Sequence, residues 1–233
     1  MSRTRLFIFP HAGASANLYL EYKKQLSNSF VDCFLYEYKG HGARYGEKFS
    51  KSIQDVSIDF LEKYSRLLEE DYIFLGHSYG TNVILDLCNT INCRKLQFPK
   101  IIYLSSGSPI HEKIDTSKEG IRELLLRQNM TASNIMTDSS LFDFFFPIIQ
   151  NDINNLNNYK ALEKKYPIEV SLFSGNNENV DMNKVWKDYY RIKNTQVFDG
   201  GHEYILKKEN VRKICDTVLN DIKMSSALQS FSA

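Results

Sequence analysis

Residues 76–80, GHSYG, have the spacing that presents a serine hydroxyl as a nucleophile. They match the pattern G-x-S-x-G, in which Ser78 would sit on a sharp turn from a strand into a helix. The flanking glycines let neighbouring chain approach a strained backbone without a clash. A fully apolar segment, 72–75, precedes the motif, and a helix-like segment follows it to about residue 92. A plain strand-to-helix turn is the alternative interpretation.

A serine hydroxyl needs a general base, and a third group must hold that base in the correct tautomer. Only His111 and His202 follow Ser78, which is where hydrolases with this turn carry their base. His202 comes after a strand-like segment, 196–198, and a Gly-Gly pair, so we expect it at the same edge of the sheet as Ser78. We therefore predict His202 as the base and His111 as a surface residue.

Two carboxylates are candidates for the third group. The strand-like segment 170–173 leads into a polar loop that carries Glu178 and Asp181. Either could accept the proton on the second imidazole nitrogen of the base. A solvated loop also carries such residues, so position alone leaves both open.

The reaction also needs two backbone N–H groups to stabilise a developing oxyanion. The turn itself would supply the N–H of Tyr79. The small-residue loop 9–15, after the first apolar segment, is predicted to supply the second donor from Ala12. A simple strand-to-helix turn is the alternative for this loop.

The elements that must position these residues alternate along the chain. Short apolar segments predict strands at 6–9, 31–36, 72–75, 101–104, 170–173 and 196–198. Helix-like spacing falls between them, at 17–26, 53–68, 80–92 and 207–223. This order predicts an α/β fold with a mainly parallel central sheet flanked by helices.

Residues 108–166 interrupt the alternation with helix-like segments and no clear strand. We predict a helical insertion, either a lid over the strand ends or an extra structural layer. Three successive phenylalanines at 144–146 exceed what one side of a helix can bury, which favours the lid. The core domain would comprise residues 1–107 and 167–223, and residues 224–233 would form a flexible tail.

Composition narrows the class of protein. The 233 residues carry 29 Lys and Arg against 28 Asp and Glu, a net charge of +1, so no global field would attract nucleic acid or an anionic membrane. Four widely spaced cysteines are too sparse for a disulfide framework, and no stretch approaches 18 apolar residues. We therefore expect a cytoplasmic protein that binds neither nucleic acid nor membrane.

Five segments, in their order and separations, resemble the type II (external) thioesterases that accompany nonribosomal peptide and polyketide synthases. The resemblance covers about residues 5–220. The segments are FIFPHAG at 7–13, GHG at 40–42, GHSYG at 76–80, FFFP at 144–147 with Asp152, and FDGGH at 198–202.

The resemblance implies an α/β-hydrolase fold and a role for each matching residue. Ser78 would be the nucleophile, His202 the base, and the N–H groups of Ala12 and Tyr79 the oxyanion hole. The family usually has an Asp three residues after the strand-end glycine, where this chain has Glu178. That position favours Glu178 as the acid, while its longer side chain keeps Asp181 as the alternative.

The implied activity is hydrolysis of acyl or aminoacyl thioesters from the phosphopantetheine arm of carrier proteins. Such an enzyme would clear misprimed or stalled carriers, or release intermediates and products. Its partners would be acyl- or peptidyl-carrier domains, and we expect a monomer. No cofactor or metal is expected, because phosphopantetheine belongs to the substrate. The alternatives are a small-molecule carboxylesterase or lipase with the same triad, and a catalytically silent binding protein.

Overall fold

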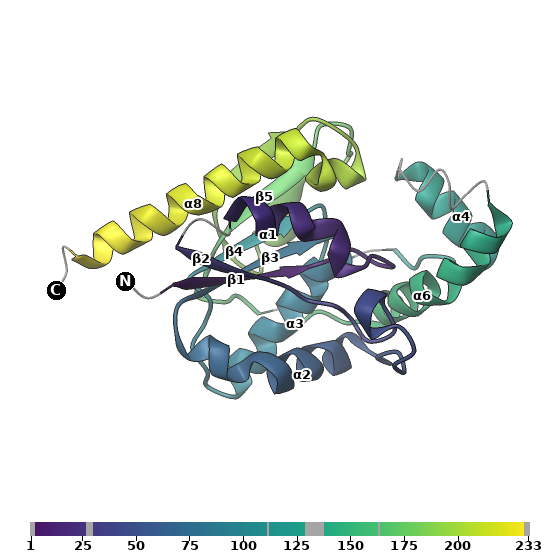
Figure 1. The fold of residues 1–233 in the computed structure, drawn as a ribbon, viewed down its shortest axis with the longest axis horizontal. Coiled ribbons are helices and arrows are strands. Elements are labelled where there is room, and N and C mark those ends of the chain that lie inside the picture. The colour runs from purple at the N-terminus through teal and green to yellow at the C-terminus, as the bar shows by residue number, and fades with distance from the viewer. Residues whose placement is uncertain (1–2, 27–29, 111, 129–137, 163, 231–233) are drawn as a thin grey trace.

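The computed structural model describes residues 3–26, 30–110, 112–128, 138–162 and 164–230, with side chains to residue 225. At its centre lies a six-stranded sheet in the order β2-β1-β3-β4-β5-β6, in which all neighbouring strands are parallel (Figure 1). Each strand overlaps one of the six predicted apolar segments, and β2 ends one residue before the predicted 31–36. The strands are β1 (Thr4–Phe9), β2 (Val31–Leu35), β3 (Tyr72–His77), β4 (Ile101–Ser105), β5 (Glu169–Gly175) and β6 (Arg191–Phe198).

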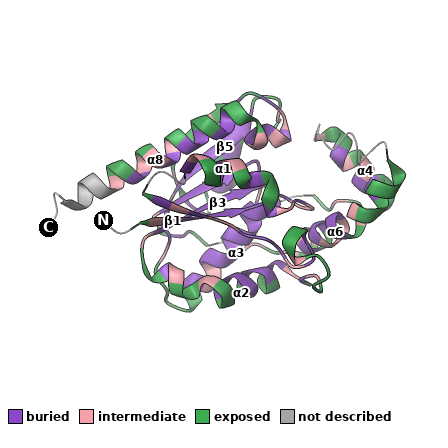
Figure 2. Ribbon diagram, in the orientation of Figure 1, coloured by how far each residue is buried: buried purple, intermediate pink, exposed green. Residues whose placement is uncertain are grey.

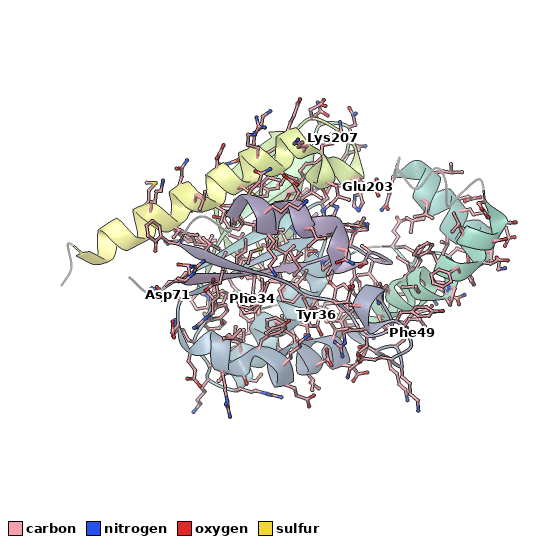
Figure 3. The ribbon with its side chains drawn as sticks, in the orientation of Figure 1. Phe34, Tyr36, Phe49, Asp71, Glu203 and Lys207 are labelled. Carbon is pink, nitrogen blue, oxygen red and sulfur yellow. The ribbon has the colours of Figure 1, made fainter. Side chains whose placement is uncertain are left out.

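The strands are apolar because the central ones are covered on both faces. All six residues of β3 are buried. In β1, Leu6 and Ile8 face one hydrophobic cluster, and Phe7 and Phe9 face the other. The second cluster is rich in aromatic rings, with the labelled Phe34 and Tyr36 between the sheet and α2 (Figure 3).

Helices cover both faces of the sheet (Figure 1). One face carries α1 (Leu20–Leu26) and α8 (Lys208–Ser230), which contact each other. The other face carries α2 (Ile53–Tyr64) and α3 (Tyr79–Cys93), and buried residues line the sides turned to the sheet (Figure 2). The last helix is longer than the predicted 207–223. Short helical turns complete the core: η1 (Ala16–Tyr19), η2 (Gly42–Arg44), η3 (Ser65–Glu69), α7 (Met182–Trp186) and η4 (His202–Leu206).

The described part of the segment between β4 and β5 contains helices but no strand. It contains α4 (Lys118–Arg127) and α6 (Ser139–Asn158), which lie together beyond one end of the sheet (Figure 1). The two helices share a small hydrophobic cluster of their own, formed by Ile121, Leu125, Phe142, Ile149 and Ile153. In the described part of the chain, no helix is long and apolar enough to span a membrane.

The sheet register brings the carboxyl ends of five strands to one edge. Phe9 of β1 pairs with Gly76 of β3, and His77 pairs with Ser105 of β4. At the end of β5, Gly175 pairs with Phe198. The loops that carry the predicted site residues therefore leave the sheet on the same side.

The turn from β3 into α3 is packed too tightly for side chains at its two glycines. A Cβ on Gly76 would lie 2.6 Å from the carbonyl oxygen of Gly80. A Cβ on Gly80 would lie 2.2 Å from the carbonyl oxygen of Phe9, in the neighbouring strand. Since both neighbours are backbone atoms, neither can move without displacing a strand or the helix.

Replacement of Gly80 by Ala is therefore expected to destabilise the fold. Overpacking at a backbone contact should lower the free energy of unfolding by about 3 kcal/mol or more. The matched control is Gly46→Ala, because Gly46 has a positive φ of 93° but no atom within 4 Å of the point that an added Cβ would occupy. Its cost should be only the conformational one, about 1–2 kcal/mol. Urea unfolding measures both, and equal losses would contradict the packing argument.

Candidate active site

Ser78 lies at the turn between β3 and α3 in a strained backbone conformation, with φ 53° and ψ −114°. A residue with a Cβ rarely adopts this φ, and strain of this kind persists only where the surroundings enforce it. Here the Ser78 N–H donates to the Ser105 carbonyl at 2.8 Å. The Ser78 carbonyl accepts from the N–H of Thr81 at 2.9 Å and from its hydroxyl at 2.7 Å. The sharp turn that the motif predicts is thus held on both sides.

His202 follows β6 and the Gly-Gly pair, at the start of η4. Its side chain is buried, and its Nδ1 lies 2.7 Å from Oε1 of Glu178. The second oxygen of Glu178 accepts hydrogen bonds from the Gly175 N–H at 2.8 Å and from the Ser106 hydroxyl. Both carboxylate oxygens are therefore used, one to orient the imidazole and one to fix the acid itself.

These contacts also set the charge of Glu178. Burial alone would raise its pKa, but the hydrogen bonds from His202, Ser106 and Gly175 outweigh burial and leave the pKa below its usual value. The carboxylate therefore stays ionised at neutral pH. An ionised acid is what an imidazole needs in order to hold its proton on Nδ1 and present Nε2 to a nucleophile.

Asp181, the other candidate acid, has a different environment. It precedes α7, and its carboxylate accepts from the Lys184 N–H at 3.1 Å, as an N-cap does. Of the two carboxylates left open by position, the structure brings Glu178 to His202 and uses Asp181 to cap a helix.

Ser78 and His202 face one pocket. Its lining also includes Ala12 and Tyr79, with apolar side chains from the insertion on the opposite side: Ile114, Leu124, Leu125, Ile149, Ile153 and Leu156. The Nε2 atom of His202 is buried and makes no hydrogen bond within the described residues. Catalytic hydrogen bonds in unliganded enzymes are often long and shorten in the substrate complex.

His77 packs against His202. It is fully buried, and its ring lies against that of His202 at a centroid distance of 4.9 Å. Its Nδ1 is 2.8 Å from the Ser105 hydroxyl, which contacts the Tyr204 hydroxyl at 2.6 Å. Burial, with the nearby His202, lowers the pKa of His77 well below its usual value. A neutral His77 would not repel a positive charge on His202.

The two residues predicted to supply the oxyanion donors line the same pocket. Tyr79 is the first residue of α3, a position whose N–H has no acceptor within the helix. Ala12 belongs to the loop after β1, and it lines the same pocket. The Tyr38 hydroxyl donates to the Pro10 carbonyl in this loop at 2.9 Å, and His11 Nδ1 contacts the Tyr19 hydroxyl at 3.0 Å.

Another buried group, beside the loop that carries Ala12, has no role assigned from the sequence. Asp152 of α6 accepts hydrogen bonds from the Gly13 N–H and from His41, which is 111 positions away in the chain. Asp152 belongs to a segment that carries the family resemblance, but nothing in its spacing indicates a contact with His41. His111 lies outside the described residues.

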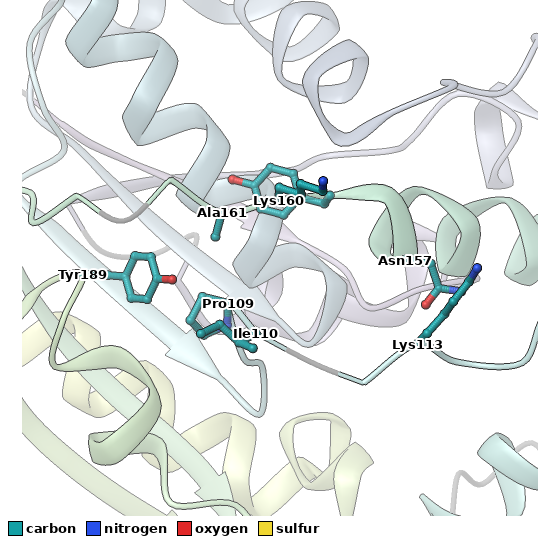
Figure 4. Close-up of a pocket in the computed structure, with 8 residues that line it drawn as sticks. Pro109, Ile110, Lys113, Asn157, Lys160, Ala161 and Tyr189 are labelled. Carbon is teal, nitrogen blue, oxygen red and sulfur yellow. The ribbon is translucent and has the colours of Figure 1, made fainter.

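A second pocket lies beside the insertion but apart from this site (Figure 4). Neither Ser78 nor His202 lines it. Lys113, Asn157 and Lys160 are on one side and Tyr189 on the other. Asn157, which lines this pocket, makes two hydrogen bonds, at 2.9 and 2.7 Å, to the backbone of Ile114, which lines the pocket of Ser78 and His202. Among the described residues, no three His, Cys, Asp or Glu side chains gather where they could hold a metal ion.

A parallel sheet, a strained serine at a strand-to-helix turn and a histidine after the last strand together define an α/β hydrolase. Within that class, the chain belongs to the thioesterase domain family, whose model matches residues 4–222. It is accordingly a hydrolase that acts on thioesters.

Similar proteins are distant in sequence but close in fold. The gramicidin S biosynthesis protein GrsT of Aneurinibacillus migulanus is 21% identical over 76% of this chain and 72% of its own. The structure of ClbQ from the colibactin NRPS/PKS pathway has a TM-score of 0.85 at 21% identity, covering 97% of this chain and 100% of that one. The type II thioesterase BorB from the borrelidin biosynthetic cluster has a TM-score of 0.77 at 20% identity, covering 96% and 92%.

The contact between Glu178 and His202 predicts which carboxylate matters for turnover. Glu178→Gln should lower kcat for an acyl thioester by about 10³–10⁴-fold, because a neutral amide favours the wrong imidazole tautomer. Asp181→Asn should leave kcat close to wild type, since Asn caps a helix as well as Asp does. Steady-state kinetics on both variants makes the comparison. A larger loss in Asp181→Asn would reassign the acid.

Proposed function

We propose that this protein is a type II thioesterase that hydrolyses acyl or aminoacyl thioesters on the phosphopantetheine arm of carrier proteins. Its role would be to clear misprimed or stalled carriers of nonribosomal peptide or polyketide synthases, or to release intermediates and products. The observation that carries the proposal is the buried His202–Glu178 pair beside the strained Ser78, within a thioesterase domain. The likeness to ClbQ and BorB supports the synthase setting.

In the proposed reaction, the Ser78 hydroxyl attacks the thioester carbonyl while Nε2 of His202 takes its proton. The N–H groups of Ala12 and Tyr79 stabilise the oxyanion of the tetrahedral intermediate. The intermediate collapses with cleavage of the C–S bond, the pantetheine sulfur takes the proton from His202 and leaves as the thiol, and an acyl-serine ester remains. His202 then activates water, which attacks the ester and releases the free acid and Ser78.

Glu178 acts throughout by holding His202. It keeps the Nδ1 proton in place and stabilises the imidazolium that forms when His202 takes the second proton. The neutral, buried His77 beneath His202 adds no opposing charge. The proposal needs no metal or cofactor, because phosphopantetheine enters as part of the substrate, and it includes the cytoplasmic, monomeric state expected from the sequence.

The second candidate is a small-molecule carboxylesterase with the same residues. The apolar pocket wall formed by α4 and α6 would accept a simple acyl ester as well as an acyl thioester. The two candidates differ in the leaving group and in the need for a carrier protein.

Parallel assays separate these candidates. One acyl group is presented on a carrier protein, as an N-acetylcysteamine thioester and as an ethyl ester, and kcat/KM is measured for each. The carrier thioester should give the highest value, and Ser78→Ala should abolish its turnover. Preference for the ethyl ester would favour a carboxylesterase. Undiminished turnover by Ser78→Ala would refute the proposed mechanism.

A further inference from the structure

We propose that Asp152 and His41 form a buried ion pair that positions the oxyanion-hole loop, and that this pair couples the loop to the helical insertion. The inference rests on the proposed function and adds to it two positioning residues. Asp152 belongs to α6 of the insertion, whereas His41 belongs to the loop after β2. Neither residue lines the catalytic pocket, so each would act through Gly13.

One oxygen atom of Asp152 joins the two partners. Its Oδ2 accepts the Gly13 N–H at 2.8 Å and lies 2.9 Å from Nε2 of His41. Asp152 is 2% exposed and His41 is 1% exposed, so water does not compete for these bonds. The Gly13 N–H belongs to the peptide unit directly after Ala12. A bond to that peptide fixes the backbone of Ala12, whose own N–H is the proposed donor.

The contacts of its two ring nitrogens favour a positively charged His41. Its Nδ1 faces the Lys39 carbonyl at 3.1 Å while its Nε2 faces Asp152. The Lys39 carbonyl and the ionised Asp152 carboxylate are both acceptors, and a doubly protonated ring donates to both. Although burial lowers the pKa of His41, the charge and hydrogen bond of Asp152, with the Lys39 carbonyl and the Glu37 charge, leave the pKa raised.

A close steric contact couples the same loop to α6. Gly13 has a φ of 74°, and a Cβ added there would lie 2.4 Å from Cγ1 of Ile149. Ile149 stands one helical turn before Asp152, so the two residues present neighbouring points of α6 to the loop. The helix therefore contacts Gly13 by packing and by a hydrogen bond. A shift of α6 would move the Ala12–Gly13 peptide, which directly follows the peptide that carries the Ala12 N–H.

The other side of the loop is held by the segment after β2. The Glu37 carboxylate accepts from the Ala16 N–H at 2.9 Å and from the Ser15 hydroxyl at 3.0 Å. Glu37 thus holds the loop from the segment after β2, and Asp152 holds the same loop from the insertion. An enzyme whose insertion had moved away would keep Ser78 and His202 but lose the alignment of one oxyanion donor.

The first test removes the acceptor in two steps. Asp152→Asn keeps an oxygen for Gly13 but removes the charge, and Asp152→Ala removes both. Losing one oxyanion donor costs about 10²–10³ in rate, so kcat should fall by about 10-fold in Asp152→Asn and about 10²-fold in Asp152→Ala. KM should stay within about threefold of wild type, since the lost interaction acts in the transition state. Asp143→Asn, on an exposed carboxylate of the same helix, is the matched control and should be unchanged.

Three readouts separate positioning from folding. The affinity for butylboronic acid, which forms a tetrahedral adduct with serine, should fall in parallel with kcat. Nitrogen-15 NMR of the histidines should show His41 doubly protonated at pH 7 in the wild type and neutral in Asp152→Asn. Thermal unfolding identifies the conditions under which each variant is folded, and kinetics are measured there. If Asp152→Ala does not fold, the isosteric Asp152→Asn carries the test.

A double-mutant cycle tests the pair as a unit. His41→Gln can still donate to Asp152 but leaves its charge unbalanced, so kcat should fall by about 10-fold, as in Asp152→Asn. The double variant His41→Gln, Asp152→Asn should lose no more than the worse single variant, because residues that act together are not additive.

Additive losses in the cycle, or folded Asp152 variants with wild-type kcat and boronate affinity, would overturn the positioning role. Ser78→Ala distinguishes this failure from a failure of the proposed function. If Ser78→Ala abolishes turnover while the Asp152 variants remain fully active, only the positioning role is refuted. Turnover by Ser78→Ala would refute the proposed function and the positioning role with it.

Discussion

The site depends on the close approach of three backbone segments around residue 78. The carbonyl of Phe9 in β1 lies where a side chain of Gly80 would project, and the carbonyl of Gly80 lies where one of Gly76 would project. Ser105 of β4 holds the Ser78 N–H. These contacts keep Ser78 in a conformation that an isolated turn would leave, because its cost of about 1–3 kcal/mol must be offset by the surrounding sheet. The parallel strands thus form the core of the fold and also hold the turn that carries the Ser78 hydroxyl.

The register of the parallel strands also brings the other site residues to the same end of the sheet as Ser78. Because β1, β3, β5 and β6 end at one edge, the loop with Ala12, the turn with Ser78 and the turn with His202 line one pocket. The loop with Glu178 contacts His202. Buried hydrogen bonds then fix each loop, and the low exposure of His202 and Glu178 strengthens the contact between them. The insertion closes the apolar side of the pocket and reaches the polar side through Asp152.

Much of this arrangement follows from local sequence patterns. Apolar runs locate all six strands, and the glycines at 76 and 80 locate the turn, because both signals arise from burial and steric limits that act over a few residues. The start of β6 is different. Residues 191–195 are mostly exposed on an edge strand, so they lack the apolar run that marks 196–198. The helix predicted from residue 17 begins as a 3₁₀ turn, in which Leu18 is exposed.

The parts that sequence alone leaves open depend on contacts between distant segments. Local spacing leaves both Glu178 and Asp181 open, and the family resemblance only favours Glu178. The approach of the β6 turn to the β5 loop is what brings Glu178 to His202. The pairing of His41 with Asp152 joins residues 111 positions apart, so no local pattern can reveal it. The most direct measurement of the central claim is mass spectrometry of the protein after reaction with an alkyl fluorophosphonate. One adduct should form on the peptide containing Ser78 and should be absent in Ser78→Ala. A folded wild-type protein that stays unlabelled at Ser78, or is labelled at another residue, would contradict the account.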